Sequence, residues 1–334
     1  MTAYALDLHD LLALVVAEGD AEPRAAVPAV ARLDGDLLHL GDAAAAGARL
    51  LPRSVHSRFW DELSVEPLGS PFPAGWRVAD LAHAHLGALW EAAGAPAEAA
   101  PLLIPGGLDE ARLPLALGVA AAAGLGLGAV VHPAVAVGAA HWPDGAERAV
   151  YLELYRHRAV AAYLRRDADS ATIAVERLAE DDRASAARLR SALVKATADA
   201  FVRTTRFDPL ARAADEQQLH DRLPAWLDAL ERHGRVDARL GDGGRTASIE
   251  LGHRELDAAA DDVTRRLEAL LDDSTPVLLG AHAAGALGVL RRLRARGVDV
   301  HALPADAACR GALAHRSQLL EIGPQVLTLR LQVP

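Results

Sequence analysis

Cysteine, lysine and aromatic residues are scarce in this chain of 334 residues. Cys309 is the only cysteine, so an intrachain disulfide and a zinc site built on several cysteines are both excluded. Lys195 is the only lysine, and aromatic residues make up 4% of the chain. The residues that dominate instead are Ala, Leu, Arg and Asp, a bias that says little about function.

A concentrated basic surface is also lacking, because the formal net charge is -10 and the acidic residues are spread along the chain. Nucleic acid binding requires such a surface, so we expect no nucleic acid partner. The densest basic stretch, residues 291–296, carries four arginines near the end of a predicted helix. We interpret it as a solvated face that suits the helix dipole, with a binding patch as the alternative.

Signals for export and for membrane insertion are weak. The first residues, Met1 to Tyr4, do not begin the basic segment and long apolar run of a signal peptide, so we expect a cytoplasmic protein. Residues 115–131 are apolar throughout, yet the stretch is rich in Ala and Gly and is marginal in length for a membrane span. A buried helix that runs into a buried strand is our interpretation, and we expect no membrane insertion.

Strand patterns open each half of the chain. Short apolar runs at 4–8 and 12–16 are followed by a hairpin signal at Asp34-Gly35. Three further strand-like runs lie between residues 149 and 178. Each cluster is followed by alternating helices and strands, among them a helix that Asp109 should cap and a turn at 241–244. This order predicts a parallel-sheet α/β construction in two similar units, with a cleft between them.

Several local strings, in the order in which they occur, resemble the ATPase domain of heat-shock chaperones, a member of the actin and sugar-kinase superfamily. The strings are Leu40-Gly41-Asp42-Ala43-Ala44, Leu103-Ile104-Pro105, Ala123-Gly124-Leu125, His132-Pro133-Ala134-Val135-Ala136, Leu278-Leu279-Gly280-Ala281, Cys309-Arg310-Gly311-Ala312 and Leu319-Leu320-Glu321-Ile322-Gly323-Pro324. The last of these looks like the start of the linker that precedes the chaperones' peptide-binding domain. The resemblance is colinear over nearly the whole chain, although each string alone is weak.

The resemblance implies an α/β protein with two similar lobes of the actin-like ATPase fold. Each lobe would be a ribonuclease H-like βββαβα unit, and a central cleft would separate them. Lobe I would span residues 1–147 with a peripheral subdomain at about 36–98, and lobe II residues 148–334 with a peripheral subdomain at about 183–245. The alternative is an unrelated doubly wound α/β protein.

The loops that grip phosphate in this family are altered here. The family reads roughly D-L-G-T-T in the first hairpin and D-L-G-G-G-T in the second, because backbone amides must approach phosphate oxygens closely. This chain reads Asp7-Leu8-His9-Asp10-Leu11 and Glu153-Leu154-Tyr155-Arg156-His157-Arg158. At about 4 Å and an effective dielectric near 20, the Asp10 charge would repel a phosphate charge by roughly 4 kcal/mol.

The other elements of the family's catalytic site are degenerate as well. In the adenosine-binding string only the first glycine remains, and Arg58 is the one basic residue where the family has a catalytic lysine. The degenerate equivalents of the catalytic acids are Asp7 and Glu153. The cleft candidates for binding a ligand are Asp7, His9, Asp10, Glu153, Tyr155, Arg156, Gly280, Ala281 and His282. As an alternative, Arg156, His157 and Arg158 could bind an anion by charge in place of the lost amides.

Two further observations bear on ligands and partners. His83 and His85 lie two positions apart on a predicted helix and face different ways, so we expect no metal site from them. Phe59, Trp60, Phe72, Trp76 and Trp90 gather in one segment. We interpret them as the core of a small subdomain, with an exposed patch that recruits a partner as the alternative.

The strings that resemble hinge and packing motifs persist, while the glycines of the phosphate loops are lost. This pattern favours a fold that is retained for its shape over one that is retained for ATP turnover. We therefore expect a pseudo-ATPase that acts as a scaffold or adaptor through another protein, without enzymatic activity and without a cofactor. The first alternative is an ATP-binding or ATP-hydrolysing protein that holds ATP or ADP with Mg²⁺ on unconventional loops. A kinase-like phosphotransferase of the same superfamily is the second.

Overall fold

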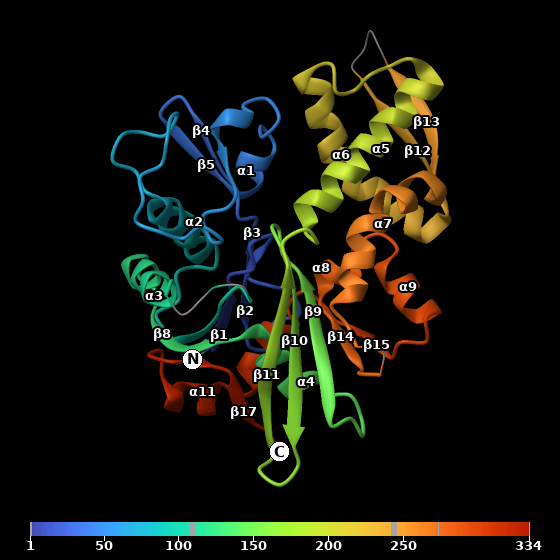
Figure 1. Cartoon of the computed structure of the whole chain (residues 1–334). Helices are drawn as coiled ribbons and strands as arrows, with labels where there is room; N and C mark the ends of the chain where they lie inside the picture. Colours follow the sequence, from blue (N-terminus) through green and yellow to red (C-terminus); the bar gives the residue numbers. More distant parts are fainter. Residues whose placement is uncertain (1, 107, 109–110, 242–245, 273, 334) are drawn as a thin grey trace.

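The protein is described by a computed structural model that covers residues 2–106, 108, 111–241, 246–272 and 274–333 (Figure 1). It is a mixed α/β structure, which confirms the predicted fold class at that level. Two sheets of six strands each form its centre. Asp109 and most of the predicted turn at 241–244 lie outside the described residues.

The first sheet is formed by the N-terminal strands and a short C-terminal one. Its strands, in sheet order, are β16 (Leu327–Thr328), β8 (Leu127–Val131), β7 (Ala100–Leu103), β1 (Tyr4–Asp7), β2 (Ala13–Ala17) and β3 (Ala25–Val27). Strand β1 pairs antiparallel with β2 and parallel with β7, and β7 pairs parallel with β8. The β1–β2 turn therefore lies at the same edge as the carboxyl ends of the parallel strands.

The second sheet repeats this plan. Its strands, in sheet order, are β15 (Val300–Ala302), β14 (Val277–Leu279), β9 (Arg148–Leu154), β10 (Ala159–Asp167), β11 (Thr172–Asp181) and β17 (Arg330–Gln332). Strand β9 pairs antiparallel with β10 and parallel with β14, as β1 does with β2 and β7. Five strands of each sheet thus share one order and one set of directions.

Two helices fill the space between the sheets. Helix α4 (Pro133–His141) and helix α10 (Ala307–Ala314) belong to one buried apolar cluster that also contains residues of both sheets, such as Leu103 and Leu278. Gly311 makes their close approach possible, since an added Cβ would collide with the carbonyl oxygen of Ala136. The sheets are therefore joined by a shared core, not only by the chain that connects them.

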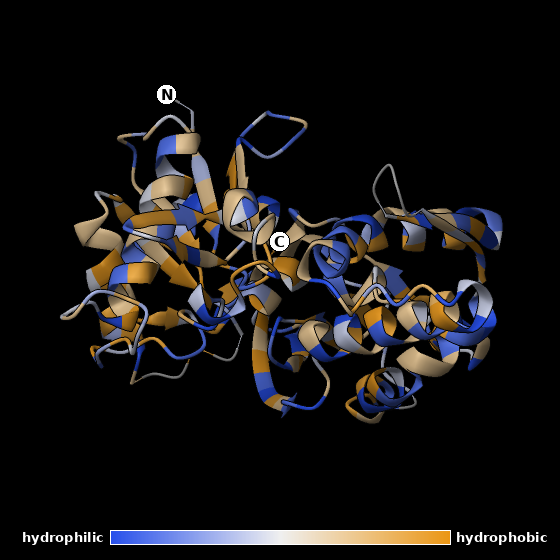
Figure 2. Ribbon diagram, turned by 90° about the horizontal axis from the view of Figure 1, so that it is seen from above, coloured by the Kyte–Doolittle hydropathy of each residue, from blue (hydrophilic) through white to orange (hydrophobic). Residues whose placement is uncertain are grey.

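The remaining elements lie on the outer side of each sheet (Figure 1). Around the first sheet they are β4 (Ala31–Asp34), β5 (Leu37–Leu40), α1 (Gly41–Ala45), a 3₁₀ turn (Pro52–Ser54), β6 (Val55–His56), α2 (Val78–Ala92) and α3 (Leu113–Ala122). Around the second they are α5 (Ala186–Thr205), α6 (Ala213–His233), β12 (Arg235–Leu240), β13 (Ala247–Gly252), α7 (His253–Ala269), α8 (Ala281–Ala284) and α9 (Val289–Ala295). Hydrophilic and hydrophobic residues alternate along the helices on the right of Figure 2, as in helices that bury one face.

Several sequence predictions can be compared directly with this fold. The hairpin at Asp34-Gly35 is present between β4 and β5, where Gly35 has a φ of 59°. The apolar stretch 115–131 runs through α3 into β8, as predicted. Among the described residues no helix combines the length and the hydrophobicity that a membrane crossing requires.

The structure also tests the predictions for the aromatic segment and for the basic helix. Phe59, Trp60 and Trp90 are buried, which confirms the subdomain-core interpretation for these three. The solvated-face interpretation of residues 291–296 was incomplete. Arg291 is paired with Asp257 at 2.7 Å, and Arg292 with Glu268 at 2.8 Å, so α9 is held against α7 by ion pairs.

The C-terminal segment differs from what the resemblance implied. Residues 319–324, which look like the start of a linker, belong largely to helix α11 (Arg316–Ile322), and Leu319 is fully buried. After this helix, β16 pairs with β8 in the first sheet and β17 pairs with β11 in the second. Only Leu329 separates the two strands. The segment therefore joins the edges of both sheets.

Candidate functional site

The predicted cleft residues do come together. Three segments meet between the sheets: the β1–β2 turn with Asp7, His9 and Asp10, the β9–β10 turn with Glu153 to Arg156, and the start of α8 at 280–282. Each lies at the carboxyl end of a strand: β1 in the first sheet, and β9 and β14 in the second. Ring stacking of His9 on Tyr155 and the hydrogen bond from Arg156 to Asp10 show that the segments of the two sheets are in contact. We call this region the cleft site.

Aromatic rings occupy the middle of the cleft site. The imidazole of His9 is stacked on the ring of Tyr155, with a centroid distance of 4.4 Å and an interplanar angle of 13°. The ring of His282 lies 4.3 Å from that of His9 on a tilted plane. His9 and Tyr155 are both buried. Two of the side chains that stand where the resemblance implies glycine therefore pack against each other.

The Tyr155 hydroxyl reaches the loop that follows β7. It accepts a hydrogen bond from the amide of Gly106 at 3.0 Å. A Cβ at Gly106 would lie 3.0 Å from this hydroxyl, so only glycine fits there without a shift of the tyrosine. The second turn is thereby fixed to the first sheet.

Glu153 binds the amides around it. Its Oε1 accepts hydrogen bonds from the amides of Leu154 at 2.8 Å and Ala283 at 3.1 Å. Its Oε2 accepts one from the Tyr151 hydroxyl at 3.2 Å. A Cβ at Gly280 would collide with the Glu153 carboxylate. Gly280 is thus needed because the carboxylate of the buried Glu153 occupies the space next to it.

Asp10 and Arg156 connect the two turns. The Arg156 amide donates to Asp10 Oδ1 at 2.7 Å, and its Nε donates to the Asp10 carbonyl at 3.0 Å. A third bond, 3.3 Å long, joins Arg156 Nη2 to the carbonyl of Leu11. The Asp10 carboxylate therefore lies against an amide of the second turn.

The other basic residues of the second turn have partners of their own. His157 Nε2 lies 3.2 Å from the Ser57 carbonyl, and Arg158 pairs with Asp61 and with Glu180. Arg58, at the place of the family's lysine, pairs with Asp61 at 2.6 Å. These contacts do not favour the alternative in which residues 156–158 jointly hold an anion, because each of the three has a separate binding partner.

Burial sets the protonation behaviour of the site. Desolvation, followed by the charge of Glu153, raises the pKa of Asp7 to about 7. Desolvation also raises the pKa of Glu153 to about 7 and that of Asp10 to about 6, although amide hydrogen bonds oppose both shifts. The pKa of His282 falls to about 4 and that of His9 falls well below its usual value, again chiefly through burial. Near neutral pH both imidazoles are uncharged.

Little space remains in the cleft site. The cavity lined by Asp7, His9, Glu153, Ala281 and His282 has a volume of about 10 Å³. A water molecule requires about this much room, so a phosphate group does not fit beside the present side chains. The described residues contain no group of three or more His, Cys, Asp or Glu side chains that could hold a metal ion.

Comparison with known proteins assigns no family. No protein-family model matches the chain, and no curated protein matches it either. The description of the site therefore depends on its own geometry.

Sequence reasoning missed two residues of the site. Tyr151 lies two positions before Glu153 on β9, and the strand period of two places both side chains on one face, so this signal was available. The role of Gly106 was not foreseeable in the same way, because it depends on how the loop after β7 approaches the second turn.

Proposed function

We propose that the protein is a pseudo-ATPase of the actin-like fold that works as a protein-binding scaffold or adaptor. Two observations support the fold: five strands recur in the same order and directions in both sheets, and the strings that resemble chaperone motifs follow one another in the same order along the chain. The proposed function is argued from the hydrogen bonds of the cleft site.

One observation carries the proposal: the amides at the cleft site already hold side chains of this chain. Asp10 accepts from Arg156, Glu153 accepts from Leu154 and Ala283, and the Tyr155 hydroxyl accepts from Gly106. In a phosphate-binding loop such amides are free to bind the anion. Here two carboxylates and a phenol take that place.

Binding ATP would require these contacts to break. A hydrogen bond to a charged group contributes roughly 1.5–3 kcal/mol, so releasing three amides from Asp10 and Glu153 costs roughly 5 kcal/mol or more. This alone weakens ATP binding by more than about a thousandfold. The displaced carboxylates would in addition repel the phosphates.

A scaffold role also agrees with the way in which the two halves of the molecule are held. At the C-terminus, β16 and β17 join the sheets. At the far end of the molecule, Gln217 of α6 accepts a hydrogen bond from the Arg49 amide at 2.7 Å and donates one to the Ala45 carbonyl at 3.0 Å. Contacts at both ends favour a fixed shape over nucleotide-driven opening.

The test is nucleotide binding by the intact protein. Thermal unfolding and calorimetric titration with ATP or ADP at millimolar concentration, with Mg²⁺, should show no stabilisation and no saturable heat. A saturable response to either nucleotide would overturn the proposal.

The scaffold part is tested separately by purification from the native host. A bound protein should be retained equally with Mg-ATP and after nucleotide removal by apyrase and EDTA. Release of the partner by nucleotide would contradict a nucleotide-independent platform.

A further inference from the structure

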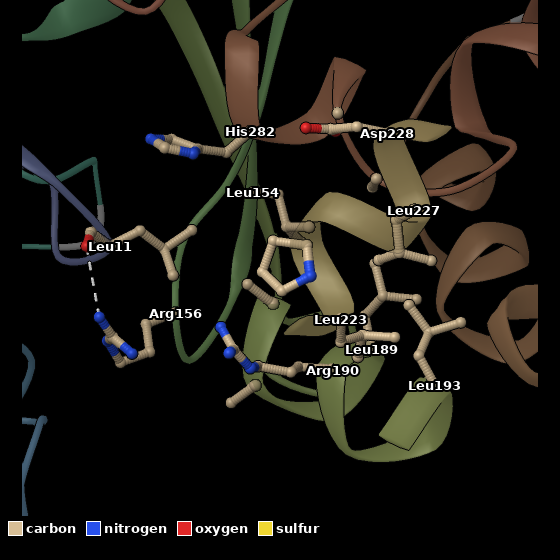
Figure 3. Close-up of a pocket in the computed structure, with 15 residues that line it drawn as sticks. Leu11, Leu154, Arg156, Leu189, Arg190, Leu193, Leu223, Leu227, Asp228 and His282 are labelled. Atoms are coloured by element: carbon tan, nitrogen blue, oxygen red, sulfur yellow. Dashed lines mark hydrogen bonds between the residues drawn. The ribbon is translucent and has the colours of Figure 1, made fainter. Parts of the chain in front are cut away.

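A second, larger cavity lies beside the cleft site. It has a volume of about 340 Å³, within the range of small-molecule sites, and is formed by the end of β9, helices α5 and α6, and the segment after α8 (Figure 3). We call it the side cavity. It shares Arg156 and His282 with the cleft site, but none of the carboxylates of that site lines it.

The walls of the side cavity are mostly apolar. Leu189 and Leu193 lie one turn apart on α5, and Leu223 and Leu227 lie one turn apart on α6, so each helix turns one apolar stripe to the cavity. The other apolar lining residues are Leu11, Leu154, Ala186, Ala187, Pro224, Gly285 and Ala286. Such walls suit the hydrocarbon part of a ligand.

Two arginines give this apolar cavity a charged end. In Figure 3 the side chain of Arg190 extends towards that of Arg156. Arg156 uses Nε and Nη2 for carbonyls of the first turn, and Arg190 uses Nε and Nη2 for the ring and carbonyl of His220. Within the described ranges, neither guanidinium forms an ion pair within 4.0 Å, and neither Nη1 has a hydrogen-bond partner.

The remaining polar side chains of the lining do not neutralise these two charges. Asp228 is exposed on α6, and in Figure 3 it lies across the cavity from both arginines. His282 is uncharged near neutral pH, since burial lowers its pKa to about 4. The charges of Asp10 and Asp221 act on Arg156 and Arg190 from outside the cavity, since neither carboxylate lines it. The cavity therefore combines an apolar wall with an end that presents two guanidinium groups.

We propose that the side cavity binds an amphipathic monocarboxylic acid of medium aliphatic chain length. Its carboxylate would lie between Nη1 of Arg156 and Nη1 of Arg190, and its hydrocarbon part against the leucines of α5 and α6. Guanidinium groups pair with planar carboxylates in well-defined geometry, and burial of the hydrocarbon adds affinity. The proposal does not depend on the scaffold function.

Calorimetric titration with octanoate tests the charge and the apolar wall together. We expect saturable binding of octanoate by the full chain and at least tenfold weaker binding of octanamide, which has the same tail without the charge. Equal binding of the acid and the amide would overturn the proposal. Tighter binding of AMP than of octanoate would also overturn it, because a nucleotide would then be the better ligand of this cavity.

Two variants test whether the ligand binds in this cavity. Arg190→Gln should weaken octanoate binding at least tenfold and leave octanamide binding unchanged, whereas Arg188→Gln, an arginine on the same helix that does not line the cavity, should change neither. Ala187→Leu fills the cavity without removing a hydrogen bond, so it should abolish binding of both ligands at an unchanged melting temperature. Wild-type octanoate affinity in Ala187→Leu would show that the acid binds elsewhere.

Discussion

The cleft site and the side cavity are neighbours that share His282, yet they have opposite character. In the cleft site, carboxylates and a phenol satisfy the amides, and about 10 Å³ remains open. In the side cavity about 340 Å³ is open, and two guanidinium groups each keep one NH₂ without an acceptor among the described residues. The comparison shows that a site can be closed by its own side chains while the space next to it stays suited to a ligand.

The largest effect should come from removing the carboxylate that closes the cleft site. Glu153→Ala leaves the amides of Leu154 and Ala283 without an acceptor and opens a cavity, so we expect a loss of about 3–5 kcal/mol in the free energy of unfolding. Urea denaturation of the variant and of the wild type measures this loss of unfolding free energy. Glu91→Ala, at an exposed position of α2, is the control and should stay within about 0.5 kcal/mol of wild type.

Glu153→Gln sharpens the same comparison, because the amide oxygen of glutamine can still accept from the two backbone amides. Its loss should be clearly smaller than that of Glu153→Ala. Equal losses for the two variants would mean that the hydrogen bonds to Glu153 do not hold the site closed.

The pH dependence of stability should reflect two opposing sets of buried groups. The folded pKa values of Asp7 and Glu153 lie near 7, above their unfolded values, so these two carboxyls lower the stability as pH rises towards 8. Five buried histidines with depressed pKa values act in the other direction, because near pH 6.5–7 they bind protons in the unfolded state only. These histidines are His9, His85, His132, His220 and His282.

From about pH 6.5 to 8 the five histidines add about 2 kcal/mol and the two carboxyls remove about 1.6 kcal/mol, so the stability of the wild type should change by less than about 0.5 kcal/mol. Urea denaturation over a pH series measures this balance. Asp7→Asn lacks one of the two carboxyls, so its stability should rise over this range by about 0.8 kcal/mol more than that of the wild type. Parallel pH profiles for the two proteins would show that Asp7 is not buried in the way described.

The contact between α6 and the segment after α1 should contribute less to stability than Glu153 does. Gln217→Ala removes the hydrogen bonds to the Arg49 amide and the Ala45 carbonyl, with an expected loss of about 1–2 kcal/mol in the free energy of unfolding. Gln218→Ala, which removes a single bond to the Gly241 amide within the second half of the chain, is the control. Hydrogen exchange at Arg49 should accelerate in Gln217→Ala alone.

Much of the arrangement could be predicted from the order of strands and turns. Asp7, Glu153 and Gly280 lie at the carboxyl ends of strands in two similar units, so their approach across a central cleft was expected before any contact was known. The residue types also indicated that the cleft was crowded and wrongly charged for a polyphosphate. Such patterns are local, and a sequence shows them directly.

The contacts that define the site could not be predicted, since they depend on side-chain directions across the two sheets. We expected Asp10 to repel phosphate, but not that it would accept from the Arg156 amide. Residues 156–158 read as a basic cluster, although each binds a different segment. The strands β16 and β17 were missed because they have two and three residues and owe their existence to pairing with distant edges.

The pairing of residues 327–332 with opposite sheets has a consequence for how the molecule comes apart. Peeling β17 from β11 pulls directly on β16, because a single residue connects them, so neither edge can fray by itself. Heating should accordingly produce one calorimetric transition for the whole chain in place of two. The two C-terminal strands thus add a mechanical link to the core that the sheets already share.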